Sequence, residues 1–430
     1  MNRRIFVRSG WRRAVTLFGF VSAATATACS EKLDAGVACP LLCPPTQEVV
    51  LKDTVIEAVV VDSTLQGYPD IGEETRLLLA ARGDTLDTRV IFRFDTLNQT
   101  YTHTATPADS IITTVDSAQL QVVVDTTTIN GIPKVTAPFT LELYDVDAAT
   151  DTVAAELVPL FTPGRLLGSR PFAAESLKDT LRIPVSNNAV LDRIKNGTHL
   201  RLGMRLVSAT STQLLMYPST SLAATLRFKP ASDTTLSVSL ISKTPSDTSS
   251  ARVRGDLADF VIVAKAPAER PPLTIAAGGT PARRTYMRFD LPAKILDSST
   301  VVRASLLLTQ FPKRDSPSAG DSVAIYAVPI TAAPVVTDVR RLLSITSPAL
   351  ASDSLRVRPA DSGVRRLELV SLVRVWASTN AATTQRSIAL TVGPEGLDPA
   401  EAVFFSSKAD AALRPRLQLT YVPRVTLGLP

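Results

Sequence analysis

Hydrophobic and polar residues alternate in short runs along most of this chain. Valine, threonine, isoleucine and leucine alternate with polar residues over residues 49–61, 90–94, 120–124, 200–206 and 417–421. A period of two places every second side chain on one face of a strand, and Pro, Gly, Asp and Ser punctuate the runs as turn residues do. With 430 residues and 30 prolines, the pattern predicts an all-β protein made of antiparallel sandwiches.

Part of this pattern occurs twice. Residues 89–95 read RVIFRFD and residues 284–290 read RTYMRFD, and a turn with two alanines and a glycine precedes each strand. Four further landmarks recur in the same order: a strand entered through alanine (118–120 and 304–306), an aliphatic strand ending in tyrosine (141–144 and 323–326), a one-turn amphipathic segment (190–194 and 372–376) and a terminal strand (222–230 and 413–423).

The recurrence indicates a duplication. We expect two tandem jelly-roll-like antiparallel β-sandwiches, each with a short helix and each long enough to bury a core without disulfides. The predicted domains are residues 49–230 and 251–424, with a linker at 231–250 and a tail at 425–430. The residues that mark the repeat are Arg93, Phe94 and Asp95 in the first half, and Arg288, Phe289, Asp290 and Trp376 in the second.

The N-terminus has the pattern of an export signal. Five arginines precede an apolar run over residues 14–28, which is too short to cross about 30 Å of hydrocarbon as a helix. The sequence Ala-Thr-Ala-Cys that ends at Cys29 resembles the lipobox of bacterial lipoproteins. The resemblance implies a signal peptide at 1–28, a lipid on the thiol of Cys29 and a tether over 29–48. The alternatives are an ordinary signal cut after Ala28, with Cys29 in a disulfide, and a twin-arginine signal.

Two other cysteines lie in this tether. If Cys29 carries lipid, Cys39 and Cys43 remain as an even pair, and an oxidising compartment favours a disulfide between them. A metal site needs about four ligands, and no further cysteine or nearby histidine is available. We therefore expect a disulfide and no metal.

The positive net charge of +6 belongs almost entirely to the signal peptide. Without its five arginines, 41 basic residues face 40 acidic ones, which excludes the clustered basic surface that nucleic acid requires. Ser30 follows the lipid site in place of the aspartate that retains many lipoproteins at the inner membrane. The expected partner is therefore a membrane reached through the N-terminal lipid, and the expected location is the outer membrane of the cell envelope.

The second half carries a further resemblance. Residues 367–376 (LELVSLVRVW), followed by 404–408 (FFSSK) and 414–417 (RPRL), resemble the strand, helix and closing strands of DNRLRE-type domains. These are jelly-roll-like sandwiches related to a family of carbohydrate-binding modules. The resemblance spans residues 50–424 and implies a secreted sandwich protein, with an envelope or extracellular polysaccharide as a possible partner. It implies no catalytic residues.

The remaining candidates for chemistry are few. No nucleophile, zinc or nucleotide motif is present, and His103 and His199 stand without a base-like pattern. Asp95 and Asp290 are expected to hydrogen-bond turn amides or neighbouring arginines, with a ligand or Ca²⁺ contact as the alternative. The acids of residues 145–156 partly follow a calcium-loop spacing but lack its glycine. We expect no cofactor.

Sugar recognition by aromatic stacking is also disfavoured. Aromatic residues make up 5% of the chain, Trp376 falls on the core-facing side of a predicted helix, and Tyr68, Tyr101 and Tyr217 are the remaining candidates. The sequence therefore predicts a non-catalytic, membrane-tethered envelope lipoprotein with a structural or adhesive role. A polysaccharide-binding lipoprotein is the alternative, followed by an unrecognised polysaccharide-degrading enzyme.

Overall fold

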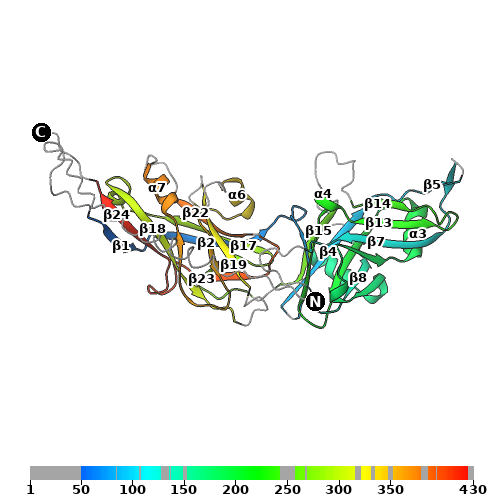
Figure 1. Ribbon diagram of the computed structural model, residues 1–430, viewed down its shortest axis with the longest axis horizontal. Coiled ribbons are helices and arrows are strands. Elements are labelled where there is room, and N and C mark those ends of the chain that lie inside the picture. The colour runs from blue at the N-terminus through cyan, green and yellow to red at the C-terminus, as the bar shows by residue number, and fades with distance from the viewer. Residues whose placement is uncertain are drawn as a thin grey trace, which may run out of the picture. The chain divides into compact units, whose positions relative to one another are not determined.

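The computed structural model describes residues 50–424 except 84, 106–107, 127–134, 136, 149–152, 243–256, 267–268, 315–320, 331–334, 347–351, 379–385 and 394. The signal peptide, Cys29, Cys39, Cys43 and the tail 425–430 lie outside these residues. Antiparallel sheets and a few short helices make up the described chain, so the all-β, sandwich-like fold predicted from the alternating pattern is confirmed (Figure 1). None of the described helices is long and apolar enough to cross a membrane.

The first sandwich consists of two sheets around one core. One sheet runs in the order β12 (Thr212–Met216), β3 (Leu77–Arg82), β4 (Leu86–Phe94), β11 (Leu200–Val207), β8 (Phe139–Asp145) and β9 (Leu166–Phe172), with β15 (Asp259–Lys265) paired to β4. The other runs β10 (Thr180–Pro184), β7 (Val115–Val123), β13 (Thr225–Pro230) and β14 (Val238–Ile241). Smaller elements are the hairpin β5 (Thr100–Thr102) and β6 (Asp109–Ile111), and the helices α2 (Ala154–Leu157), η1 (Val158–Leu160), η2 (Pro163–Arg165), η3 (Ala174–Ser176), α3 (Asn187–Asn196) and α4 (Ser219–Leu222).

Alternation explains how these strands bury one face. On β7, Leu120 and Val122 are buried, while Gln119 and Gln121, which alternate with them, belong to the opposite face. The helix α3 begins where the Ser186 hydroxyl accepts a hydrogen bond from the Ala189 N–H (3.4 Å), and it ends at a left-handed glycine. Its buried side chains, Val190 and Ile194, join the same core.

The second sandwich is one sheet path that folds back over its own core. Its strands follow the order β1 (Lys52–Ile56), β24 (Arg416–Pro423), β18 (Ser299–Phe311), β23 (Glu401–Phe405), β16 (Thr274–Gly278), β17 (Ala282–Phe289), β22 (Ser387–Gly393), β19 (Val323–Ile330) and β20 (Leu355–Val357). In addition, β2 (Val59–Tyr68) pairs with β17 and β21 (Gly363–Glu368) pairs with β18. The short helices are α5 (Ala293–Leu296), α6 (Val339–Ser344) and α7 (Val370–Ser378). Side chains from both ends of the path share one hydrophobic cluster.

The two halves exchange their leading strands. β1 and β2 open the chain but pair with β24 and β17, late in the sequence. β14 and β15, which open the second repeat, pair with β13 and β4 of the first. In Figure 1 the blue β1 and β2 accordingly lie among the yellow-to-red strands. The first sandwich is therefore formed by residues 77–265, and the second by residues 52–68 together with 274–423.

This exchange corrects the predicted boundaries. Residues 52–68 fall within the predicted first domain but complete the second sandwich, and the predicted linker 231–250 contains β14 of the first. The sequence landmarks report the order of strands along the chain. Pairing depends on contacts between residues far apart in that order, and the landmarks carry no information about it.

The strand registers nevertheless support the duplication. Asp259 lies opposite Phe92 and Asp62 lies opposite Met287, which are equivalent positions of β4 and β17. Each aspartate accepts a hydrogen bond from a backbone N–H that follows an equivalent strand. Asp259 accepts from Ser219, after β12 (2.6 Å), and Asp62 accepts from Ser407, after β23 (2.5 Å). The two sandwiches therefore correspond residue by residue in this region.

Candidate functional site

A polar cleft of about 540 Å³ opens beside β2 in the second sandwich, within the volume range of small-ligand sites. Its walls come from β2, the segment entering β16, the start of β17 and the turn after β23. Consecutive residues of β2 line the cleft, and alternate side chains of a strand point to opposite faces, so the cleft is bordered by the edge of this strand. The lining residues are Asp62, Ser63, Thr64, Gln66, Glu269, Arg270, Pro271, Pro272, Leu273, Thr274, Ile275, Arg283, Ser406 and Lys408.

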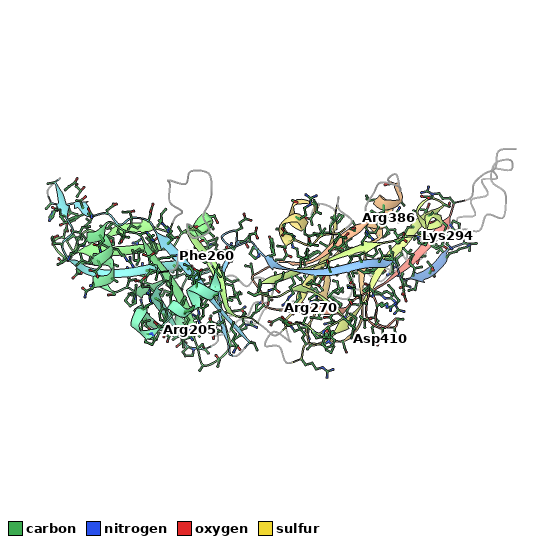
Figure 2. All side chains as sticks on the ribbon, turned by 180° about the vertical axis from the view of Figure 1, so that it is seen from behind. Arg205, Phe260, Arg270, Lys294, Arg386 and Asp410 are labelled. Carbon is green, nitrogen blue, oxygen red and sulfur yellow. The ribbon has the colours of Figure 1, made fainter. Side chains whose placement is uncertain are left out.

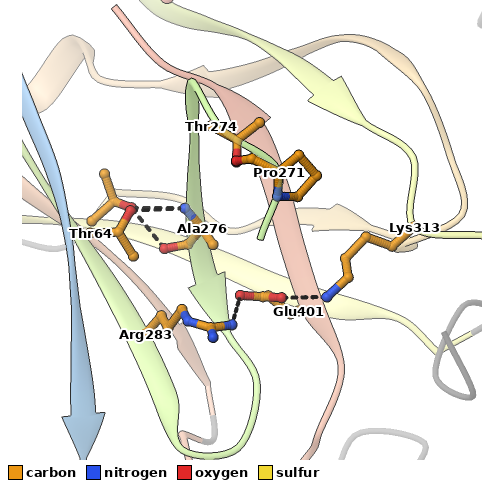
Figure 3. A network of polar contacts seen from close by, with 8 residues as sticks. Thr64, Pro271, Thr274, Ala276, Arg283, Lys313 and Glu401 are labelled. Atoms are coloured by element: carbon orange, nitrogen blue, oxygen red, sulfur yellow. Dashed lines mark hydrogen bonds and ion pairs between the residues drawn. The ribbon is translucent and has the colours of Figure 1, made fainter. Parts of the chain in front are cut away.

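Beside the cleft, β16 stays paired with β23 but diverges from β17. β17 pairs with β2 along its whole length but with β16 at Gly278 and Arg283 alone. The Ala276 N–H, which lacks a ladder partner on β17, instead donates to the hydroxyls of Thr64 (3.1 Å) and Thr285 (3.2 Å). The Thr285 hydroxyl also donates to the Ala276 carbonyl (2.7 Å). Figure 3 shows Ala276 beside Thr64. Two threonine hydroxyls therefore satisfy backbone groups that would otherwise be buried unpaired.

An ion triad fixes one wall. Glu401 on β23 is 4% exposed and bridges two cations, Arg283 of β17 and Lys313 beyond β18 (Figure 3). The Lys313 ammonium lies 2.6 Å from the carboxylate. Burying a carboxylate is costly unless cations compensate it, so the triad holds the Arg283 guanidinium in a defined place at the cleft.

The rim of the cleft contains a strained leucine backbone and two positively charged side chains. Leu273 has a φ of 56° and is the one non-glycine residue with positive φ in the described part of the chain, a conformation that costs a leucine free energy. Its carbonyl accepts a hydrogen bond from the Ser406 N–H (2.9 Å), while its side chain is 56% exposed. The side chains of Arg270 and Lys408 make no ion pair or hydrogen bond with described residues. The rim thus offers one apolar side chain and two uncommitted cations.

The equivalent place in the first sandwich is filled. Strand register equates Ser63 with Phe260, which is fully buried, and Pro272 with Glu74; Figure 2 labels Phe260 in the first sandwich and Arg270 in the second. The Glu74 carboxylate accepts hydrogen bonds from the N–H groups of Val261 (3.2 Å) and Gly72 (2.6 Å). Burial raises the pKa of Glu74 to about 7, and burial also raises that of nearby Asp259 to about 6.

The repeat landmarks serve the cores and strand ends. Phe94 and Phe289 are buried, and the ring of Trp376 in α7 packs 5.6 Å from that of Phe289 with 3% exposure, so it is not displayed to a ligand. Asp95 and Asp290 lie at the surface of their strand ends, and neither carboxylate has a side-chain partner among the described residues. The structure brings none of these landmarks into the cleft.

A charged cluster in the first sandwich brings together residues that the sequence named separately with an arginine that it did not name. Asp145 and Asp147, two acids of the calcium-like spacing, both contact Arg193 (3.1 and 3.0 Å), and His199 Nε2 lies 2.7 Å from Asp147. Burial raises the pKa of Asp147, and the neighbouring His199 and Arg193 partly offset this rise. No group of acids, histidines or cysteines with metal-site geometry occurs among the described residues.

The candidate tyrosines are engaged within the protein. Arg284 lies 4.2 Å from the ring centroid of Tyr68, and Arg76 lies 4.1 Å from that of Tyr217. Tyr101 is 6% exposed, and its hydroxyl lies 2.6 Å from that of Ser232. None of these three rings forms an exposed stacking platform.

Comparisons with known proteins give no family. No family model and no curated protein matches the chain. Among solved structures, a peptide-N4-(N-acetyl-β-D-glucosaminyl)asparagine amidase shares 10% identity over 78% of this chain and 96% of its own, with a TM-score of 0.16. The VP2 subviral particle of infectious bursal disease virus shares 10% over 89% and 79%, with a TM-score of 0.13. At these TM-scores the likeness supports no inference about this chain.

The cleft is therefore a polar binding site in form. Its hydroxyls, amide and cations offer hydrogen bonds and charge to a ligand, and the fixed Arg283 and strained Leu273 define its shape. Sequence motifs could not find it, because Thr64 and Thr285 lie 221 positions apart. One available signal was the difference between the repeats at Ser63 and Phe260, but that comparison requires the strand register.

Proposed function

We propose that this chain is a non-catalytic, membrane-tethered β-sandwich protein of the cell envelope, with a structural or adhesive role. The lipobox-like sequence at Cys29 provides the anchor, and the strand exchange provides the observation that carries the proposal. The segment that follows the tether becomes β1, which pairs with β24 from Lys52–Tyr421 to Ile56–Leu417. A pull on the tether is therefore transmitted to the protein through a strand ladder.

The same exchange ties the two sandwiches together. The chain passes from β2 into the first sandwich and returns from β15 to β16, so two connections join the two bodies. Cutting one connection leaves the other intact, and each body still holds its exchanged strands. This architecture suits a protein that must resist force or proteolysis outside the cell.

Lipid attachment gives the direct test. Cells expressing the full chain are fed radiolabelled palmitate, and membranes are separated on a density gradient. We expect label on the wild type in the outer-membrane fraction and none on Cys29→Ser. Cys39→Ser is the matched control and should keep its label, since the disulfide pair is not the lipid site. An unlabelled wild type, or label retained by Cys29→Ser, contradicts the proposal.

Polysaccharide binding is the second candidate, and the polar cleft favours it. The cleft carries hydroxyl, amide and charged groups without an aromatic ring, which fits a ligand held by hydrogen bonds rather than by stacking. A glycan array probed with the chain from residue 46 onward, which retains β1, tests this candidate. Binding that Arg283→Ala weakens would support it, whereas silence across neutral and acidic polymers would leave the structural role alone.

A further inference from the structure

One backbone N–H group has different surroundings in the two sandwiches. In the first, the Val261 N–H on β15 donates to the Glu74 carboxylate at 3.2 Å. Val261 lies opposite Val90 of β4, and Thr64 lies opposite Thr285 of β17, which are equivalent positions. In an antiparallel ladder this register determines whether an N–H points toward the partner strand or away from it. The Thr64 N–H therefore points away from β17, toward the cleft.

The second sandwich has no carboxylate at the position of Glu74. The position of Glu74 is occupied by Pro272, which has no carboxylate, and Glu269 of the same segment lines the cleft at a different position. Ser63 stands at the strand position of Phe260, and its buried hydroxyl has no hydrogen-bond partner among the residues that the structure describes. Buried polar groups are normally hydrogen-bonded. The space that Glu74 fills in the first sandwich is open in the second, so the polar groups beside that space lack the partner that Glu74 provides in the first.

The charged residues at two positions beside this space also differ between the two sandwiches. Arg270 and Lys408 line the cleft, and the same register places Gly72 and Thr220 at their positions in the first sandwich. At these two positions the first sandwich, which contains the acid, carries no charge, whereas the second has two cations whose side chains make no ion pair or hydrogen bond with described residues. Two acids, Asp62 and Glu269, also line the cleft, and Asp62 is the equivalent of Asp259, which lies near Glu74 in the first sandwich. The two cations attract a carboxylate and strengthen its hydrogen bonds.

We propose that the cleft binds an acidic peptide segment in extended form, with one of its carboxylates hydrogen-bonded to the Thr64 N–H between Arg270 and Lys408. The first sandwich contains the model for this ligand, because residues 72–74 place a glutamate against the edge of β15. The exposed edge of β2 offers backbone donors and acceptors to an extended chain. Leu273, exposed at the rim, provides an apolar contact. This proposal is independent of the membrane tether.

The chain supplies its own probe. A capped, fluorescein-labelled peptide copying residues 70–76 (DIGEETR) is titrated against the protein from residue 46 onward, with anisotropy as the readout. We expect saturable binding that weakens as salt rises. A peptide with glutamine at the position of Glu74 should bind about tenfold more weakly, because it keeps the shape and loses the charge. Absence of binding, or equal binding of both peptides, overturns the proposal.

Protein variants place the peptide in the cleft. The double variant Arg270→Ala, Lys408→Ala should weaken binding about tenfold, and Pro272→Glu should abolish it by supplying the missing carboxylate from within. Lys229→Ala on β13 of the first sandwich is the matched control and should bind as the wild type does. Thermal melting of each variant establishes that it folds. Unchanged binding by Pro272→Glu overturns the proposal.

A competition experiment distinguishes a peptide ligand from a sugar ligand. Oligomers of a uronic acid carry the same carboxylate chemistry on a different backbone. We expect them to displace the peptide only at much higher concentration, because they cannot pair with the edge of β2. If they bind the cleft and the peptide does not, the ligand is an acidic glycan and the peptide proposal is wrong.

Discussion

The two sandwiches share a strand plan but differ in how the chain completes them. The first is continuous from β3 to β15, whereas the second borrows β1 and β2 from the opposite end of the sequence. The first places Glu74 against the edge of its exchanged strand, while the second leaves an open cleft at that edge. The two sandwiches thus share a strand plan and differ at one strand edge, which the chain itself occupies in one and leaves open in the other.

The largest effect should come from removing the borrowed strands. A chain that begins at residue 70 lacks β1 and β2, so the second sandwich loses two ladders and the core contacts of Ala58 and Val59. We expect calorimetry to show loss of the unfolding transition of the second sandwich, while the first, continuous sandwich keeps its own. Limited proteolysis should then leave a fragment spanning β3 to β15. Survival of both transitions would show that the exchange is dispensable.

A core substitution tests whether the filled site supports the first sandwich. Phe260→Ala removes a fully buried ring and should destabilise this sandwich by about 3–5 kcal/mol in denaturant unfolding. Ser63→Ala at the equivalent position of the second removes a hydroxyl without a partner and should change stability by less than about 1 kcal/mol. Similar costs at both positions would contradict the contrast between a filled and an open site.

Acidity should affect the first sandwich through Glu74. Burial raises its pKa from 4.5 to about 7, so the folded state binds the proton more tightly than the unfolded state. The stabilisation is complete below pH 4.5 and disappears as pH rises through 7, a loss of about 3 kcal/mol. Asp259, whose pKa is about 6, adds a similar loss at lower pH.

Denaturant unfolding at pH 5, 6.5 and 8 measures this loss. Glu74→Gln should flatten the decline between pH 6.5 and 8, where Asp259 is already largely ionised in both states. An unchanged slope in the variant would show that Glu74 does not titrate in this window.

The smallest effect concerns the threonine pair at the end of the cleft. Thr64→Val copies Val261 of the first sandwich and should cost about 1 kcal/mol, because the Ala276 N–H still reaches the Thr285 hydroxyl at 3.2 Å. Thr285→Val should cost more, since that hydroxyl serves both the N–H and the carbonyl of Ala276. The reverse order in denaturant unfolding would contradict the assigned roles.

Sequence reasoning reached the fold but not the site. The alternating runs predicted β-strands, and strands such as β7 bury the side chains that the alternation selects. The domain boundaries were wrong at residues 52–68 and 238–241, because a strand carries no local mark of the partner with which it pairs. The spacing of Asp145 and Asp147 suggested a cation site, and the structure pairs both with Arg193 and places His199 beside Asp147.

The sequence by itself determined the strand content, the duplication and the order of elements, because these depend on side-chain periodicity and on local turn residues. Tertiary structure alone decided which strands complete each sandwich and where a cleft opens. Both depend on contacts across hundreds of residues, such as Thr64 with Thr285 and Asp62 with Ser407. Burial sets the energy of such contacts, and burial exists only after the chain has folded.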